Sequence, residues 1–457
     1  MLRRILCWLL TACAVFGLTG CMAINSADLL TLPEISPEHR ELLKLINNVT
    51  DSSAWSTTNP VAGDNKLTTQ FVDLYQDGIP EALAFFKNPA DFTLRLSVYT
   101  KTGKSTYSEL CTIEMAGEQF HRIDCVDVNG DGNRELVVGI RYATSAMYGL
   151  NIYAVKNGEG ILLADTTYTD LALCDLTGDS VADIVTVNTD ESGNNAYAEL
   201  FTRTETGVAS AGRAPISAAV RTPAAMICGD LNESMCAAIV EGKFTDSTGA
   251  MRYLSDVLVC RDGVFTNLSY AEIYHQSFET QRSVALTFAD VDFNGYLEFP
   301  ISFSMPHPAN VSVAGGVCVR WFGYTPAGEV KAVTDTYHAS DNSWFFTLPH
   351  TWNDRVYVKS VTGDGYRAGE FVIDVDGTAQ TLLTIYMFST ESARLKCDVP
   401  NLIFLPEYND IYYAATVTAA EDLPAEAKDL AAAAEEVAER LVFVSTGGAY
   451  RRASTVR

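Results

Sequence analysis

Positive charge is scarce in this sequence of 457 residues, and no stretch concentrates it. The chain has 32 Lys and Arg against 57 Asp and Glu, a formal net charge of −25. Because phosphate binding needs basic patches, this balance argues against nucleic acid as a partner. It also leaves no polybasic segment for electrostatic contact with a membrane. An acidic surface instead suits solubility and cation binding.

Catalytic signatures are also missing. None of the six His forms a His-Glu-x-x-His pair, and no Gly-x-Ser-x-Gly elbow, P-loop or dinucleotide fingerprint is present. The sequence has no Cys-x-x-Cys pair for zinc or redox chemistry. It therefore names no catalytic residue. Trp321, Trp344 and Trp352 could line a sugar site, although packing is the more common role of Trp.

The N-terminus has the layout of a signal peptide. Arg3 and Arg4 precede an apolar run over residues 5–18, which is too short for a bilayer span of roughly 20 residues. The run ends in Leu18-Thr19-Gly20-Cys21, which resembles a bacterial lipobox. The resemblance implies cleavage after Gly20 and diacylglycerol on Cys21, and hence a lipid anchor at the extracytoplasmic face of the cell membrane. The alternative is an ordinary signal peptide with a chance cysteine.

The remainder has no second apolar run of transmembrane length and should be soluble. Eight Cys follow Cys21, and export permits disulfides between them. Cys125, Cys174 and Cys228 lie in apolar runs just before a repeated motif, so we expect buried thiols at these three positions.

The repeated motif is an apolar stretch ending in Asp, a short polar loop and an apolar strand. Its five leading residues are spaced by 54, 48, 55 and 60 positions; they are Asp73, Asp127, Asp175, Asp230 and Asp290. Between motifs, alternating strands are joined by Gly-containing hairpins, as at Asn157-Gly158 and Asp262-Gly263. Each unit thus holds about four strands in about 50 residues, which is the template of a propeller blade.

The loops with the pattern Asp-x-Asn-x-Asp-Gly-x-x-Glu, best matched by residues 127–135 and 290–298, resemble FG-GAP/VCBS repeats. The resemblance implies a mainly β protein. Residues 51–348 would form a β-propeller of the integrin-α type, with about five to seven four-stranded blades. Lipid-anchored surface proteins with such loops are familiar from Firmicutes and have no assigned function. A solenoid or an open sheet is the main structural alternative.

The flanks of the repeats differ from them. Residues 21–50 should form the anchor, a linker and a short helix that begins at Ser36-Pro37-Glu38. Residues 349–446 should form a small α+β domain, and residues 447–457 a disordered tail. We expect strands over residues 352–360, 370–374, 382–388 and 411–417, and a helix over 424–440. The apolar helix faces are Leu42, Leu45, Ile46 and Val49 in the first helix, and Leu430, Ala434, Val437 and Leu441 in the second.

The Asp loops have the composition of calcium sites. Calcium takes six to eight oxygens, which a tight loop can supply from side chains at positions 1, 3, 5 and 9 and a carbonyl at 7. The second loop offers Asp127, Asn129, Asp131, the carbonyl of Asn133, and Glu135; the fifth offers Asp290, Asp292, Asn294, the carbonyl of Tyr296, and Glu298; the third offers Asp175, Thr177, Asp179 and Asp183. We predict Ca²⁺ with a structural role in these loops.

The other two loops are weaker candidates. The first has Asp73, Asp77 and Glu81, but Tyr75 at position 3 is a poor ligand. The fourth has no ligand at positions 5 and 9, and a disulfide between Cys228 and Cys236 could replace the ion there. For every loop the alternative is a metal-free turn in which Asp and Asn cap backbone amides.

Two functions from different classes fit this sequence. The first is a cell-surface binding or scaffolding module whose ligand is a protein or a glycan. The second is a carbohydrate-active hydrolase or lyase with its site at the propeller channel. Both hypotheses stay open, because a fold alone does not determine function. Acids gathered with Trp or Tyr at the channel mouth would favour the enzyme.

Overall fold

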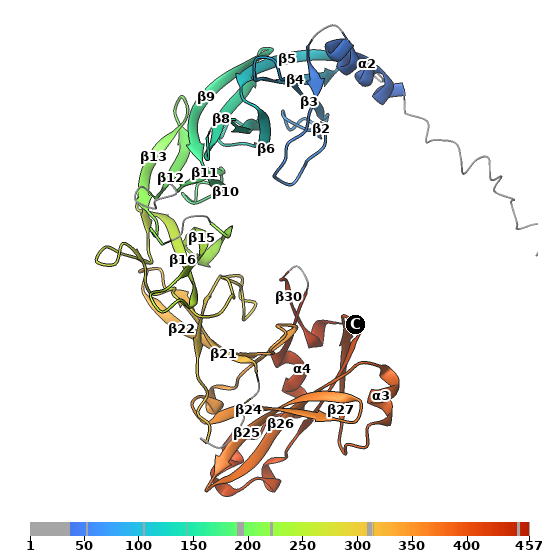
Figure 1. The fold of residues 1–457 in the computed structure, drawn as a ribbon, viewed down its shortest axis with the longest axis vertical. Helices are drawn as coiled ribbons and strands as arrows, with labels where there is room; N and C mark the ends of the chain where they lie inside the picture. Colours follow the sequence, from blue (N-terminus) through green and yellow to red (C-terminus); the bar gives the residue numbers. More distant parts are fainter. Residues whose placement is uncertain are drawn as a thin grey trace, which may run out of the picture. The chain divides into compact units, whose positions relative to one another are not determined.

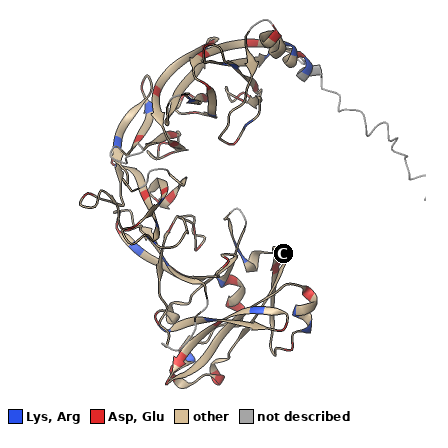
Figure 2. Cartoon of the chain, viewed as in Figure 1, with Lys and Arg blue, Asp and Glu red and all other residues tan. Residues whose placement is uncertain are grey.

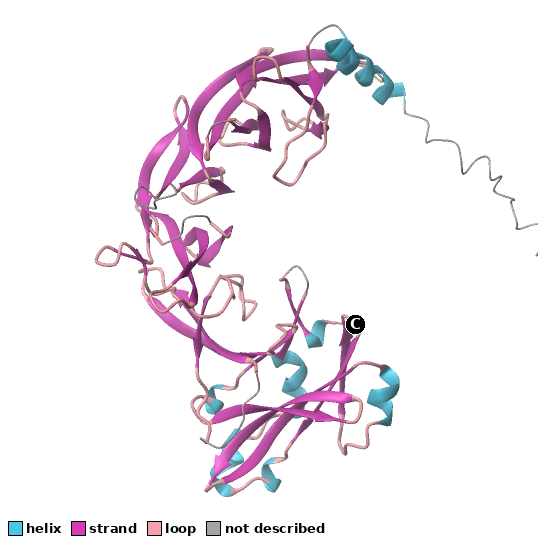
Figure 3. Ribbon diagram, in the orientation of Figure 1, coloured by secondary structure: helices cyan, strands magenta, loops and turns pink. Residues whose placement is uncertain are grey.

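The computed structural model describes residues 37–51, 54–103, 106–143, 145–189, 196–219, 223–308, 313, 315–445 and 448–456. The protein is mainly β, with antiparallel sheets and a few short helices (Figure 1). Figure 3 shows how little of the chain is helical. The proposed signal peptide and Cys21 lie outside the described residues. Within the described ranges, no helix combines the length and the hydropathy needed to span a bilayer.

Four sheets repeat one plan, in which consecutive strands pair antiparallel. The first contains β2 (Thr69–Val72), β3 (Glu81–Asn88), β4 (Thr93–Lys101) and β5 (Tyr107–Ala116), with β1 (Ser56–Thr57) also paired to β3. The second contains β6 (Gln119–Val126), β7 (Glu135–Arg141), β8 (Tyr148–Lys156) and β9 (Glu159–Tyr168). The third contains β10 (Asp170–Cys174), β11 (Asp183–Asn188), β12 (Tyr197–Thr204) and β13 (Gly207–Pro215). The fourth contains β14 (Ala225–Asn232), β15 (Met235–Thr245), β16 (Met251–Arg261) and β17 (Val264–Asn267).

The fifth sheet departs from this plan. Its first strand is reduced to one bridge, Ala289 to Glu298, and a short hairpin of β18 (Tyr270–Ala271) and β19 (Gln276–Ser277) precedes it. The sheet continues with β20 (Phe299–Phe303), β21 (Val317–Tyr324), β22 (Val330–His338) and β23 (Trp344–Thr347). Beyond β23 it is extended by β29 (Leu441–Val444) and β30 (Tyr450–Arg452), which come from the end of the chain.

The hairpins between these strands form as their sequences predict. Asn157-Gly158 and Asp262-Gly263 each join two strands through a two-residue loop. Their φ angles are 54° and 81°, and 53° and 74°. Positive φ at both central residues is the signature of type I′ turns, whose twist matches that of the strands.

The chain divides into two compact units, one of Met1–Phe120 with Val155–Gly160 and the other of His121–Ala154 with Ile161–Arg457. In the first, helix α2 (Pro37–Asp51) packs Leu42 and Ile46 against Ala84 and Phe86 of the first sheet, which confirms the predicted helix. In the second, apolar clusters join the second sheet to the third, the third to the fourth, and the fourth to the fifth. The shared pairs include Ile152 with Ile184, Leu200 with Leu258, and Ile239 with Phe299.

The C-terminal part forms a separate sheet in the order β24-β25-β26-β28-β27. Its elements are η1 (His350–Trp352), β24 (Val356–Gly363), β25 (Tyr366–Val375), β26 (Thr378–Phe388), α3 (Glu391–Lys396), β27 (Ile403–Tyr408) and β28 (Ile411–Val417). The predicted strand over residues 411–417 coincides with β28. The strand expected from Trp352 begins later, at Val356, because Trp352 closes a short 3₁₀ turn and is buried in the core of this sheet.

The helix predicted over residues 424–440 is wrong. The segment is broken into η3 (Ala425–Leu430), η4 (Ala434–Glu436) and α4 (Val437–Arg440), after η2 (Ala420–Asp422). The carbonyls of Glu426 and Leu430 would accept from residues four ahead in a continuous helix. They accept instead from the Arg355 guanidinium and from Trp352 Nε1, both at 2.8 Å. Leu430 and Val437 are buried as expected, but Ala434 is exposed.

The tail expected to be disordered has structure at residues 448–456. It contains β30 and a final 3₁₀ turn, η5 (Ala453–Thr455), and Ala453 is fully buried. The pairing of β30 with β29 supplies the backbone hydrogen bonds that a free tail would lack.

The three Trp residues considered as a sugar platform belong to the core. Trp321, Trp344 and Trp352 are 0–2% exposed. Their indole N–H groups donate to Thr336 Oγ1, Met387 Sδ and the Leu430 carbonyl. Packing is therefore their role, since a stacking platform for a sugar needs an accessible ring face.

Candidate metal centre

The Asp loops occupy one place in the repeat, between the first and second strands of a sheet. At position 1, Asp73, Asp127, Asp175 and Asp290 each accept backbone N–H bonds from residues three to five ahead, at 2.7–3.1 Å. At position 5, a side-chain oxygen accepts from the amide of position 7, as Asp131 does from Asn133 and Asn294 from Tyr296. These contacts are the capping bonds of Asx turns.

The acid at position 9 has a different role, which is to accept a hydrogen bond from the backbone amide of position 2. The residue at position 2 is apolar and 1–3% exposed in all five repeats; these residues are Leu74, Val128, Leu176, Leu231 and Val291. Its backbone amide is buried with it and needs an acceptor. In four loops the acid at position 9 supplies that acceptor at 2.9–3.1 Å; these acids are Glu81, Glu135, Asp183 and Glu298, each 1–2% exposed. Each loop therefore closes over a buried carboxylate.

The fifth loop brings three carboxylates together. One oxygen each of Asp290, Asp292 and Glu298 lies within 4.8 Å of the other two, the only such group of three His, Cys, Asp or Glu among the described residues. Oxygens bound to one calcium ion at about 2.3–2.6 Å lie at most about 5.2 Å apart, so this spacing fits the ion. Capping uses only some of the lone pairs on these oxygens. The distinguishing residue is Asp292, because the other loops have Tyr, Asn or Thr at position 3.

The remaining predicted ligands of the fifth loop are engaged in the turn. Asn294 Oδ1 accepts from the Tyr296 amide at 2.7 Å, and Asn294 Nδ2 donates to Asp292 at 3.1 Å. The side chain of Asn294 thus stabilises the loop through contacts of its own.

The second loop does not gather its acids in this way. Asn129 Nδ2 donates to Glu135 at 2.6 Å and to Asp131 at 3.4 Å, so an amide lies between the two carboxylates. Asn129 Oδ1 caps the Asp131 amide at 2.8 Å. The predicted ligands of the second loop thus contact one another within the turn, and calcium binding there stays a prediction.

In the third loop, a positively charged side chain already pairs with one of the acids. Arg203, on β12, forms an ion pair with Asp179, and Thr177 donates its amide and its hydroxyl to Asp183. A Cβ added at Gly130 of the second loop would lie 3.0 Å from Arg203 Nη1. The guanidinium thus lies against both loops, which the spacing of the motif did not reveal.

The fourth repeat has no such loop. The ladder between β14 and β15 continues to the pair Asn232 and Met235, so backbone bonds close the hairpin. The predicted bridge between Cys228 and Cys236 is not formed, and both cysteines are free. Cys228 is exposed and Cys174 and Cys125 are only half-buried, so the expectation of three buried thiols is wrong for Cys228.

Burial raises the pKa of every position 9 acid. The pKa of Glu298 rises to about 8 through burial, and the charges of Asp292 and Asp290 add to the effect. The pKa of Glu135 rises to about 7, again chiefly through burial, with Asp131 and Asp127 adding to it. For Glu81 and Asp183 burial is also the largest cause of a raised pKa. A bound cation would oppose these shifts because it favours the ionised carboxylates.

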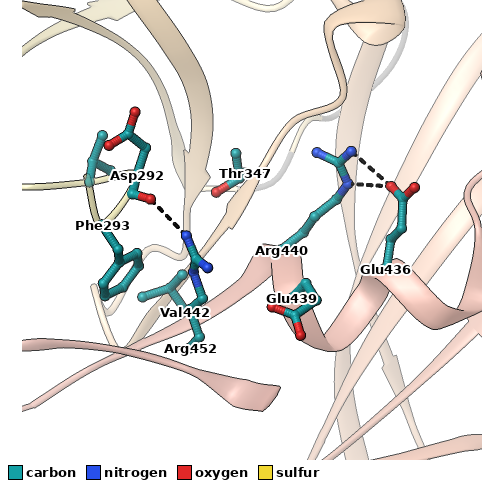
Figure 4. A pocket seen from close by; sticks show the side chains of 9 residues that line it. Asp292, Phe293, Thr347, Glu436, Glu439, Arg440, Val442 and Arg452 are labelled. Carbon is teal, nitrogen blue, oxygen red and sulfur yellow. Dashed lines mark hydrogen bonds and ion pairs between the residues drawn. The ribbon is translucent and has the colours of Figure 1, made fainter. Parts of the chain in front are cut away.

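A pocket of about 270 Å³ adjoins the fifth loop (Figure 4). Arg452 of β30 donates to the Asp292 carbonyl at 2.7 Å and stacks over the Phe293 ring at 4.5 Å. Across the pocket, Arg440 pairs with Glu436, and Glu439 lies beside them. Arg452, near the end of the chain, thus contacts the fifth loop, in which the three carboxylates lie close together. Figure 2 shows that acidic residues elsewhere are spread over strands and loops, with Lys and Arg few between them.

The chain matches no known protein family profile and no curated protein. Among solved structures it is similar to the exotype rhamnogalacturonan lyase YesX, with 13% identity, a TM-score of 0.29, and coverage of 79% of this chain and 63% of the lyase. It is also similar to a putative exo-beta-1,3-galactanase from Bifidobacterium bifidum s17 (9% identity, TM-score 0.23, coverage 72% and 95%). TolB from Acinetobacter baumannii shows 10% identity, a TM-score of 0.21, and coverage of 67% and 65%. The chain thus spans less than two thirds of the lyase, and at these TM-scores the similarities carry no argument about function.

Proposed function

We propose that this protein is a lipid-anchored binding or scaffolding module of the cell surface. Its repeated sheets would be the blades of an FG-GAP/VCBS-type β-propeller, and its fifth loop would hold a structural calcium ion. The observation that carries the calcium assignment is the cluster of Asp290, Asp292 and Glu298 oxygens within 4.8 Å. The repeated sheets, the shared apolar clusters between them and the recurring Asp loops support the propeller.

The ion would act on stability and not on a substrate. Three carboxylates held together repel one another, and burying Glu298 adds a desolvation cost. A divalent cation offsets both by neutralising the cluster, and it would fix the loop against β30 through Asp292 and Arg452. The proposed module would then present its strand-connecting loops to a protein or glycan ligand.

The direct test is thermal unfolding of the purified protein with calcium, with magnesium and with EDTA. A ligand that binds only the native state raises the melting temperature once its concentration exceeds its dissociation constant. We expect a rise with calcium that EDTA reverses and that magnesium, which demands tighter octahedral geometry, does not reproduce. Equal melting temperatures in all three conditions, with no metal found in the purified protein, would refute the calcium assignment.

The anchor and the absence of catalysis need their own measurements. Mass spectrometry of the protein isolated from membranes should find diacylglycerol on Cys21, and the Cys21→Ser variant should be released from the membrane. Incubation with a panel of polysaccharides should release no reducing ends and no unsaturated products. Release of either would favour the carbohydrate-active alternative over the binding module.

A further inference from the structure

Three thiols from two neighbouring sheets meet at one place in the fold. Cys174 is the last residue of β10 in the third sheet, and Cys228 and Cys236 lie on β14 and β15 of the fourth. β10 contacts both of these strands. The Cys174 thiol interacts electrostatically with the thiols of Cys228 and Cys236. All three cysteines are free in the structure.

The direction of each side chain follows from strand alternation. Leu171 and Leu173 of β10 belong to the apolar cluster shared with the second sheet. Cys174 points the other way and packs with Cys236 in the cluster shared with the fourth sheet. Cys174 therefore faces the β14–β15 hairpin across the boundary between two sheets.

The two thiols of that hairpin are poorly placed to bond to each other. Cys228 pairs with Ala238, and Cys236 pairs with Asp230, so the two cysteines share a face but lie diagonally. Diagonal neighbours have Cα atoms about 7–8 Å apart, beyond the usual disulfide range of about 4.4–6.8 Å. Cys174 is the third thiol at this boundary, because β10 contacts both strands of the hairpin.

We propose that Cys174 and Cys228 form a disulfide that joins the third sheet to the fourth. Cys228 is the exposed member, so an oxidant reaches its sulfur first. In the first step the Cys228 thiolate attacks a disulfide RS–SR, whose S–S bond breaks as a mixed disulfide forms and RS⁻ departs. In the second step the Cys174 thiolate attacks the Cys228 sulfur and releases the second RS⁻. The two protein thiols lose two electrons and their two protons, and the disulfide becomes two RSH molecules.

The bridge would act as a covalent staple between sheets that otherwise meet through apolar side chains. It closes a long loop of the unfolded chain, and long loops give the larger entropic stabilisation in the chain-entropy model. In the cell, formation of this disulfide would require export to an oxidising compartment. Oxidised glutathione can supply the disulfide in vitro, so failure of the lipid anchor would leave the test intact.

The test is disulfide mapping of the wild-type protein after incubation with oxidised glutathione and alkylation of the remaining thiols. Glu233 lies between Cys228 and Cys236, so cleavage after glutamate separates them onto different peptides. We expect a peptide linked through Cys174 and Cys228, and a melting temperature that falls when dithiothreitol is added. Cys236→Ser should keep the linkage, whereas Cys228→Ser should lose it. A Cys174 thiol that stays alkylatable, or a linkage between Cys228 and Cys236 or between Cys174 and Cys236, would overturn the assignment.

Discussion

Arg203, on β12, forms an ion pair with the carboxylate of Asp179, so a positively charged side chain lies against the third Asp loop. The fifth loop, with the same turn contacts, gathers three carboxylates instead. Four loops of one motif thus share a backbone shape and differ in how they balance charge. The carboxylate at position 3 makes the fifth loop the candidate for a metal ion, and its nearest guanidinium, Arg452, donates to a backbone carbonyl, whereas Arg203 pairs with a carboxylate of the third loop.

Removing the Arg203 charge should create a cation response in the third loop. In Arg203→Gln, Asp175, Asp179 and Asp183 lose their nearby guanidinium, and added calcium should then raise the melting temperature more than it does in the wild type. The variant itself should lose less than about 1 kcal/mol in EDTA, because both partners of the pair are partly exposed. Urea unfolding with and without calcium measures both effects. Arg213→Gln, which breaks the pair with Glu199 in the same sheet, is the matched control.

Removing one charge of the fifth loop should abolish its calcium response. In Asp292→Asn the side-chain oxygen can still cap the Asn294 amide, but the cluster loses a carboxylate. At 100 times the dissociation constant the wild type should gain about 2.7 kcal/mol from the ion, and the variant should gain much less. Asp131→Asn in the second loop keeps the equivalent cap on Asn133 and should leave the calcium response unchanged. Equal responses in the two variants would contradict the assignment to the fifth loop.

The sequence predicts the repeat well because the repeat depends on local contacts. The leading Asp, the buried position 2 and the acid at position 9 all act within nine residues, and the strands between them alternate with clear Gly turns. The same local patterning identifies the N-terminal helix, in which Leu42 and Ile46 are buried as expected.

The features that sequence reasoning missed depend on contacts between distant residues. Arg203 is 24 positions from Asp179, and Arg452 is 160 positions from Asp292. The helix expected over residues 424–440 has a helical pattern, but Trp352 and Arg355 take two of its carbonyls from more than 70 positions away. Periodicity describes a segment by itself and contains no information about such partners.

The stability of the metal-free protein should fall as pH rises through the titration of Glu298. Its folded pKa, about 8, lies above its ordinary value of 4.5, so between these values the native state binds more protons than the unfolded state. The contribution of Glu298 to the free energy of unfolding is therefore fully present below about pH 4.5, and it is lost as pH rises toward 8. Glu298→Gln keeps an acceptor for the Val291 amide and cannot ionise.

Compared with the wild type in EDTA, Glu298→Gln should be more stable at pH 8.5 by roughly 1–3 kcal/mol, and the difference should shrink toward pH 5. Urea unfolding at both pH values measures it. Glu114→Gln, on the edge strand β5, changes an exposed acid and serves as the control. A difference between Glu298→Gln and the wild type that does not vary with pH would show that Glu298 does not titrate in this range.

The contact of Arg452 with the fifth loop should hold the end of the chain in place. Arg452→Ala removes the hydrogen bond to the Asp292 carbonyl and the stack over Phe293, at a cost of about 1–2 kcal/mol. Among the described strands, β30 pairs with β29 alone, so this loss should appear locally, as faster hydrogen exchange and proteolysis at residues 448–456. Arg451→Ala, at the neighbouring exposed position, should leave the exchange rates unchanged. If calcium slows the exchange of β30 in the wild type but not in Arg452→Ala, the arginine is the link between the loop and the C-terminal strand.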